Sequence, residues 1–322
     1  YEEYTLVSNS ALSMYSSFED FGAARKVFES LEEKDLVTWN TMISGYNQVK
    51  MGESAMSVYK RMHSIGVKPD EFTYGSLLAS SLDINALEMV QACVIKIGLL
   101  SSKVEISNAL ISAYSKHGEI AKADLIFERS LKKNLVSWNA IISGLYHNGF
   151  PFKGLEKFSD LLETEVLILP DAYTLSTLLS ICINTSSLLL GKQTHAYVLR
   201  HGQFKETLIG NALINMYSQC GTLEKSLEVF NQMSQKDVVS WNSLISAYAR
   251  HGEGERAVMT YKTMQDEGKV DPDASTFAAV LSACSHAGLV EEGLEIFNSM
   301  VEPNVNHFSC LVDLLGRAGR LD

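Results

Sequence analysis

The sequence predicts an all-α fold, an α-solenoid of stacked helix-turn-helix repeats that forms a right-handed superhelix over residues 1–322. Two observations carry this prediction. Similar stretches recur at fixed steps along the chain, and each stretch places apolar residues at helical spacing. A third observation is an absence. Alternating residues around Asn-Gly, which mark β-hairpins, do not occur, because the single Asn148-Gly149 pair lies in a helical pattern.

Three kinds of unit alternate along the chain, and the trio recurs three times. The stretch LVTWNTMISGY begins at residue 36 and returns in altered form at 135 and 238, at steps of 99 and 103 residues. A second set, beginning with SNSALSMYS, starts at 8, 107 and 210, and a third, beginning with EFTYGSLLAS, starts at 71, 172 and 274. Units of about 31 to 37 residues that repeat in this way are typical of solenoids.

Each unit is expected to contain two helices. The first has about a dozen residues and ends at or beside a glycine, as in HGE at 117–119. The second is amphipathic with its charges outward, as in TLEKSLEVFNQM. Four of the five prolines stand in the closing segments between units, where helices must stop. Most units close on an aspartate: Asp35, Asp70, Asp171, Asp237 and Asp273.

The composition excludes several classes of protein. Hydrophobic residues make up 46% of the chain, which suffices for a folded core, but no apolar run approaches the roughly 20 residues of a membrane helix. The first residues, YEEYTLVSNS, carry no targeting signal. The five cysteines are scattered and include no C-x-x-C pair, so we expect neither disulfides nor a metal site, and no cofactor.

The net charge of −11 argues against a nucleic-acid partner until the charges are placed on the units. The chain has 27 Lys and Arg and 38 Asp and Glu, but the first 14 positions of the ten units hold only seven charged residues. The first helices are therefore close to neutral, and the acidic residues belong to the second helices and turns. Binding through such a face would depend only weakly on salt.

The stretches VSWNxxISGY, SNALIxMY, TFxxVLSAC and DLLGRAGRLD resemble those of pentatricopeptide repeat proteins, in the class that mixes standard, long and short repeats. The resemblance covers essentially the whole chain, with the three variants in the expected order. It predicts short repeats at 5–35, 104–134, 207–237 and, in part, 305–322, standard repeats at 36–70, 135–171 and 238–273, and long repeats at 71–103, 172–206 and 274–304. Residues 1–4 are then the tail of a preceding repeat in a longer protein.

The resemblance implies that each repeat binds one base of single-stranded RNA. The fifth and last residues read the base, and an aliphatic second residue packs on the base faces. The implied reading pairs are Asn9 with Asp35, Asn40 with Asp70, Asn108 with Asn134, Asn139 with Asp171, Asn211 with Asp237, and Asn242 with Asp273. The implied packing residues are Leu6, Val37, Val136, Leu208 and Val239; Glu105 departs from this pattern.

In this class Asn-Asp pairs favour uracil, Asn-Asn pairs favour cytosine and Thr-Asp pairs favour guanine. The implied target is therefore 5′-UU-n-C-U-n-UU-n-3′, with the long repeats unread because Gly75, Ser176 and Ala278 hold their reading position. The resemblance further implies the targeting module of an RNA editing or processing factor of mitochondria or chloroplasts. Such a module acts with an editing or accessory protein and without a membrane.

The residue chemistry leaves alternatives open. An asparagine amide carries both a donor and an acceptor, which suits the mixed edge of a pyrimidine. The closing aspartates also suit helix N-caps, and a hydrogen-bonded asparagine ladder that braces neighbouring repeats is the rival to base reading by the asparagines. A protein- or peptide-binding α-solenoid scaffold is the alternative function.

The sequence predicts no catalytic residues. The deaminase that follows some proteins of this class requires H-x-E and C-x-x-C to hold and use zinc. Neither motif is present, since His195 is followed by Ala-Tyr. The chain is therefore not expected to be an enzyme by itself.

Overall fold

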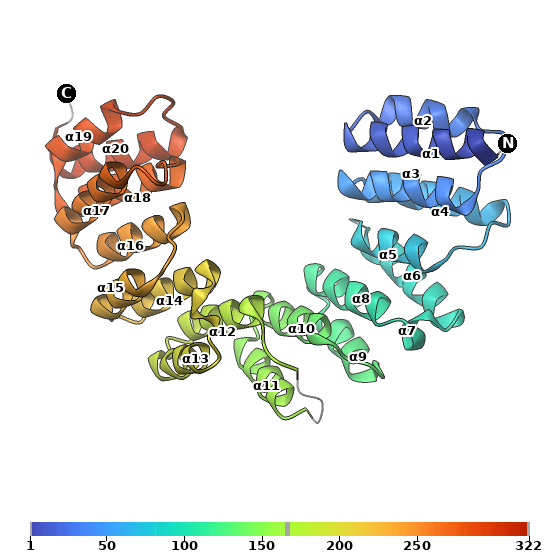
Figure 1. Ribbon diagram of the computed structural model, residues 1–322, viewed down its shortest axis with the longest axis horizontal. Helices are drawn as coiled ribbons and strands as arrows, with labels where there is room; N and C mark the ends of the chain where they lie inside the picture. Colours follow the sequence, from blue (N-terminus) through green and yellow to red (C-terminus); the bar gives the residue numbers. More distant parts are fainter. Residues whose placement is uncertain (1, 81, 165–167, 321–322) are drawn as a thin grey trace. The chain divides into compact units, whose positions relative to one another are not determined.

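The computed structural model describes the backbone of residues 2–80, 82–164 and 168–320, and side chains from residue 5 onward (Figure 1). All regular elements in these ranges are helices, which confirms the predicted all-α fold. The chain divides into two compact units, Tyr1–Leu169 and Pro170–Asp322. Tyr1 of the predicted tail 1–4, and 321–322 of the last predicted repeat, lie outside the described residues.

The first unit stacks pairs of helices, and the first helix of each pair packs against the first helix of the next. These first helices are α1 (Glu2–Ser17), α3 (Leu36–Gln48), α5 (Glu71–Ala79), α8 (Val104–Lys116) and α10 (Leu135–His147). Their partners are α2 (Phe21–Ser30), α4 (Gly52–Ser64), α6 (Ile84–Lys96), α9 (Ile120–Arg129) and α11 (Pro151–Leu162), with the one-turn helix α7 (Leu99–Ser102) between α6 and α8.

The second unit repeats this arrangement. Its first helices are α12 (Ala172–Asn184), α14 (Thr207–Gln219), α16 (Val238–Arg250), α18 (Ala274–Ala287) and α20 (Val305–Arg317). Their partners are α13 (Leu188–Arg200), α15 (Leu223–Gln232), α17 (Gly254–Glu267) and α19 (Val290–Asn298), and a short 3₁₀ helix η1 (Gln203–Lys205) precedes α14. Each first helix again contacts the next one along the chain.

Glycines end several first helices where the sequence predicts it. Gly118, Gly221 and Gly252 follow α8, α14 and α16 with φ of 77°, 79° and 75°, a left-handed backbone that glycine adopts without steric cost. Gly98 and Gly202, at φ of 77° and 68°, precede α7 and η1. These two short helices fall within predicted long repeats and were not themselves predicted, since three or four residues carry no periodic signal.

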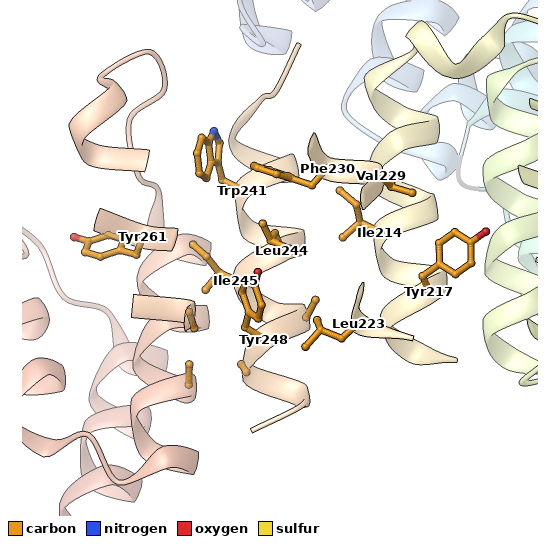
Figure 2. Packing of buried hydrophobic residues seen from close by; sticks show 14 of the residues in the cluster. Ile214, Tyr217, Leu223, Val229, Phe230, Trp241, Leu244, Ile245, Tyr248 and Tyr261 are labelled. Carbon is orange, nitrogen blue, oxygen red and sulfur yellow. The ribbon is translucent and has the colours of Figure 1, made fainter. Parts of the chain in front are cut away.

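The three tryptophans form the same core contact in three places. Each packs edge-on against a phenylalanine of the preceding second helix, with ring centroids 4.8 to 5.0 Å apart: Trp39 on Phe28, Trp138 on Phe127 and Trp241 on Phe230. Figure 2 shows the last pair among Leu244, Ile245 and Tyr248. Edge-to-face pairs of this kind stabilise beyond their buried area, so these contacts fix each unit against the one before.

The described cysteines are free thiols. Burial raises the pKa of Cys182 and of Cys284 to about 12, which keeps both thiols protonated and unreactive at neutral pH. Within the described ranges, no helix has the length and apolar character that crossing a membrane demands.

Candidate nucleic-acid interface

The closing residues of the complete predicted short and standard repeats are the N-caps of the next first helices. In each case the side-chain Oδ1 accepts a hydrogen bond from the backbone N–H three residues later, at 2.7 to 3.0 Å. The residues are Asp35, Asp70, Asn134, Asp171, Asp237 and Asp273. Asp and Asn are among the best N-cap residues, so this geometry follows directly from the sequence.

The predicted reading asparagines reach across to these caps. In five pairs the asparagine Nδ2 donates to Oδ1 of the closing residue, over 3.0 to 3.4 Å. The pairs are Asn9 with Asp35, Asn40 with Asp70, Asn108 with Asn134, Asn211 with Asp237, and Asn242 with Asp273. The structure thus brings the two predicted residues together, and it contains the hydrogen-bonded ladder between neighbouring units.

The sixth predicted pair spans the two compact units. Asn139 lies half-buried on α10 in the first unit. Asp171 lies in the second unit, where it caps α12 and accepts from the Thr174 N–H at 2.8 Å. Each residue is therefore described within its own unit.

At two sites, a hydroxyl at the third position of a first helix completes the contact, and the sequence interpretation missed it. The Thr73 Oγ1 lies 2.6 Å from Asn40 Oδ1 and 2.8 Å from Asp70 Oδ1, so its one proton is shared between them. The Thr38 hydroxyl bridges Asn9 and Asp35 in the same way, at 2.8 and 2.7 Å. The signal was present in the sequence, because a Ser or Thr three residues after an Asp or Asn resembles a capping box.

The caps remain ionised. Burial alone would raise the pKa of the Asp70 carboxyl, but hydrogen bonds from the Thr73 backbone and hydroxyl and from Asn40 outweigh it and lower the pKa. The same balance lowers the pKa of Asp35, Asp237 and Asp273. Each site therefore presents a carboxylate at neutral pH.

At Asp70 and at Asn134 the side-chain hydrogen bonds leave one atom of the cap available. Those of Asp70 all end on Oδ1, which leaves its Oδ2 as an acceptor. In Asn134 the Ser137 backbone N–H fixes Oδ1 as the inward atom, and its Nδ2 makes no hydrogen bond within the described chain. The Asp70 site therefore offers an acceptor where the Asn134 site offers a donor.

The five predicted base-packing residues are all on the surface. Leu6, Val37, Val136, Leu208 and Val239 are between 51% and 69% exposed although they are aliphatic. Isolated exposed aliphatics are common, but these occupy one register position, the second residue of a predicted repeat. Phe72 and Tyr173, which the sequence interpretation did not include, hold the same position in two predicted long repeats and are 69% and 50% exposed.

Cavities lie between these exposed residues. One of about 1050 Å³ is lined by Leu6 and Val37, with Asn9 and Asp35 also in its wall. A second, of about 510 Å³, is lined by Val37 and Phe72 together with Asn40 and Asp70. Each contains one apolar residue from either neighbouring unit and one polar pair, which is the arrangement needed to hold a flat ring with a hydrogen-bonding edge.

The lysines that precede three of the caps have a structural role. Lys34, Lys133 and Lys236 each lie 5.0 to 5.2 Å from a phenylalanine ring and donate to the carbonyl three residues earlier. The rings are those of Phe28, Phe127 and Phe230, which also hold the tryptophans. These cations are therefore engaged with the protein itself.

No cluster of His, Cys, Asp or Glu within the described ranges has the composition of a metal site. His195, the one residue considered for zinc chemistry, instead contacts the Tyr217 hydroxyl through Nδ1 at 2.9 Å.

The fold and the repeated cap contacts define an α-solenoid of helical-hairpin repeats. The family described as PPR repeat family matches residues 34–80 and 236–286, and the family described as PPR repeat matches 106–135, 136–164, 211–238 and 275–305. The chain belongs to the pentatricopeptide repeat family, as its sequence indicates.

Curated relatives from Arabidopsis thaliana support this assignment. Pentatricopeptide repeat-containing protein At3g49740 is 84% identical over 278 residues, which cover 86% of this chain and 38% of that protein. Pentatricopeptide repeat-containing protein CRR2, chloroplastic, is 36% identical over 97% of this chain and 49% of its own length. The chain thus spans between about a third and somewhat over half of such relatives.

Solved structures share the fold. The pentatricopeptide repeat protein PPR10 in complex with an 18-nt psaJ RNA element superposes with a TM-score of 0.63 at 18% identity, over 98% of this chain and 53% of that one. PPR10 from maize gives a TM-score of 0.54 at 18% identity, over 97% of this chain and 52% of that one.

Proposed function

We propose that this chain binds single-stranded RNA and reads one base per standard or short repeat, with a preference for pyrimidines. Reading one base per helical repeat is the established mode for repeats of this class. The observation that carries the proposal is the cavity bounded by Val37 and Phe72 with Asn40 and Asp70 in its wall. PPR10, whose fold this chain shares, was solved in complex with an RNA element, which supports the partner class.

The atoms left available at this cavity match uracil. The Asn40 amide uses one N–H for Asp70 and keeps a second, which suits the O4 acceptor of uracil. The Asp70 carboxylate suits the N3–H donor of the same base, because its Oδ2 takes no part in the side-chain contacts of the cap. Val37 and Phe72 would then pack on the two faces of the base, where stacking contributes about 1–3 kcal/mol.

The Asn108 and Asn134 pair suits cytosine for the same physical reason. Cytosine has an acceptor at N3 where uracil has a donor, so a carboxylate facing N3 would repel it. Asn134 presents its Nδ2 instead, since its Oδ1 is occupied by Asn108 and Ser137. Asn in place of Asp therefore presents a donor to the base in place of an acceptor, and it still caps the following helix.

We further propose that the repeats belong to the mixed standard, long and short class, with the predicted boundaries. The proposed role is that of the targeting module of an organelle RNA editing or processing factor. The alternation of three unit types supports the class. Relatives named chloroplastic, CRR2 among them, support an organelle, either chloroplast or mitochondrion.

The test is a change of base preference at one position. Fluorescent RNAs of the form 5′-UU-A-C-U-A-UU-A-3′ are compared with versions that carry G, A or C at the second base. The unsubstituted protein should prefer U there by about tenfold, because one hydrogen-bonded base edge contributes roughly 1 kcal/mol or somewhat more. The Asn40→Thr protein should prefer G at the second base and keep its preferences elsewhere.

The matched control is Asn47→Thr, the same exchange on the same helix at a residue that does not line the cavity. It should leave the second-base preference at U. Equal, weak binding of every RNA by all three proteins would overturn the proposal and favour a scaffold that binds proteins or peptides.

A further inference from the structure

The long repeat at 71–103 contains a cavity of its own, next to the one proposed for uracil. Its volume is about 370 Å³, and it is lined by Phe72, Gly75 and Ser76 of α5 and by Lys103, Glu105 and Ile106 at the start of α8, with Glu71. Phe72 and Ser76 line both this cavity and the one that contains Asn40 and Asp70. Phe72 therefore separates two successive cavities and offers a ring to each.

The wall of this cavity has no side chain at the reading position. A Cβ built on Gly75 would meet nothing within 4 Å, so the space that an asparagine fills in the neighbouring units is open here. A glycine cannot hydrogen-bond a base edge. The opening does leave room for a larger ring system than the pyrimidine proposed for the Asn40 site.

Three charged side chains, Glu71, Lys103 and Glu105, line this cavity together with the Ser76 hydroxyl. Lys103 holds the closing position and forms an ion pair with Glu71, the first residue of α5. The two side chains are 43% and 37% exposed, so both are accessible from solvent. Lys103 lies at the N-cap of α8 without a side-chain capping bond, and its ammonium is therefore not required by the helix.

We propose that this long repeat binds guanine, stacked on Phe72 with its O6 and N7 facing Lys103 and its N1–H and N2–H facing the Glu71 carboxylate. The inference rests on the proposed RNA binding and specifies a base that the resemblance leaves unread. Guanine presents two acceptors beside two donors, which pair with an ammonium beside a carboxylate; lysine on O6 and N7 is a common specific contact to guanine. Adenine presents a donor where guanine has O6, so the ammonium disfavours it.

The other long repeats provide a contrast within the chain. The fifth and last positions of these repeats are held by Ser176 with Glu206 and by Ala278 with Asn304. Neither pair includes a cation. Asn304 is also committed to the cap of α20, where it accepts from the Asn306 and His307 N–H groups at 3.0 and 3.2 Å. The guanine preference is therefore expected at the third base of the target and not at the sixth or ninth.

The test compares four RNAs, 5′-UU-n-C-U-A-UU-A-3′ with each base at n. The protein should bind the G version about tenfold more tightly than the others, at the low end of what a bidentate base contact gives. Lys103→Met keeps the apolar stem and should abolish the G preference. Phe72→Ala should weaken binding of all four RNAs. The matched control is Lys96→Met, which removes the same charge from an exposed position in the last turn of α6 and should leave the G preference intact.

The same experiment separates this inference from the proposed function. The preference for U at the second base is measured with each protein. A flat response at the third base, or a G preference that survives Lys103→Met, overturns the guanine site while the second-base preference still supports RNA reading. Loss of preference at both bases in the unsubstituted protein overturns the proposed function itself.

Discussion

At the scale of single residues, the side chains proposed to read bases also join neighbouring units. Each of five asparagines donates to the cap of the next first helix, so the amide that would contact RNA is held in place before RNA arrives. Asn108 and Asn211 are only 8% and 6% exposed, so the packing around them also restricts their side chains. Preorganisation of this kind lowers the entropic cost of binding.

The ionised caps predict a pH dependence of stability. Since folding lowers the pKa of Asp70, the unfolded chain binds more protons in acid, and stability rises with pH. The contribution is complete above the unfolded pKa of about 3.9 and is lost as the pH falls through the folded value below it. Urea unfolding between pH 3 and 7 should show Asp70→Asn losing less stability in acid than the unsubstituted chain, because asparagine keeps the cap without titrating, as at Asn134. Parallel pH curves for the two proteins would contradict this account.

At the scale of helices, close packing between first helices depends on one small residue. A Cβ on Gly45 of α3 would lie 2.9 Å from the Ser16 Cβ of α1, and one on Gly144 of α10 would lie 2.8 Å from the Ser115 Cβ of α8. The third copy has Ala247 at this position, so the second unit makes the corresponding approach with a methyl group. Both glycines lie inside α-helices, where the backbone does not require glycine. Their small size is therefore required by the contact between the helices.

Gly45 faces a neighbouring helix and Gly75 faces open space, so the substitution of alanine should have opposite effects on stability at these two positions. Gly45→Ala should lower the free energy of unfolding by about 1–3 kcal/mol, the usual cost of overpacking. Gly75→Ala should raise it by roughly 0.5–1 kcal/mol, because alanine favours the helix and the site has no atom within 4 Å. Urea unfolding of both proteins measures the two values. Equal stabilisation at both positions would mean that α1 and α3 separate without cost.

The sequence predicted the helices well because each of them carries a periodic apolar face, and it predicted the caps because Asp and Asn have a specific backbone role. The pairing of Asn40 with Asp70, 30 residues away, came only from the resemblance, because the hydrogen bond between them depends on how α3 packs against α5. The role of Phe72 was missed for a related reason. A surface aromatic has no sequence signal of its own until neighbouring units place it beside a cavity.

At the scale of the whole molecule, the chain carries a net charge of −11, and most of its charged residues lie outside the first helices, although the capping aspartates add carboxylates to the proposed RNA-binding face. The first helices contribute few charges, and the ion pairs that link successive units lie on second helices, as between Arg61 of α4 and Glu29 of α2, or Lys122 of α9 and Glu88 of α6. The lysines that precede three of the caps, Lys34, Lys133 and Lys236, lie over phenylalanine rings. Affinity for RNA should therefore come from base contacts more than from phosphates.

This distribution predicts a shallow dependence of RNA affinity on salt. Three cations, Lys116, Arg250 and Arg317, fall within the first 14 positions of the units, so the slope of log affinity against log salt should not exceed about 2, at roughly 0.7 per phosphate contact on a single strand.

Ser13→Lys adds a cation on α1 beside the two cavities that Ser13 lines, and it should raise affinity and steepen the slope by about 0.7. Ser57→Lys adds the same charge on the second helix α4 and should leave the slope unchanged. Binding is measured between about 50 and 300 mM salt, a range over which such slopes are resolved. A steep slope in the unsubstituted protein, or an equal response to both lysines, would place the RNA on a different face of the helices.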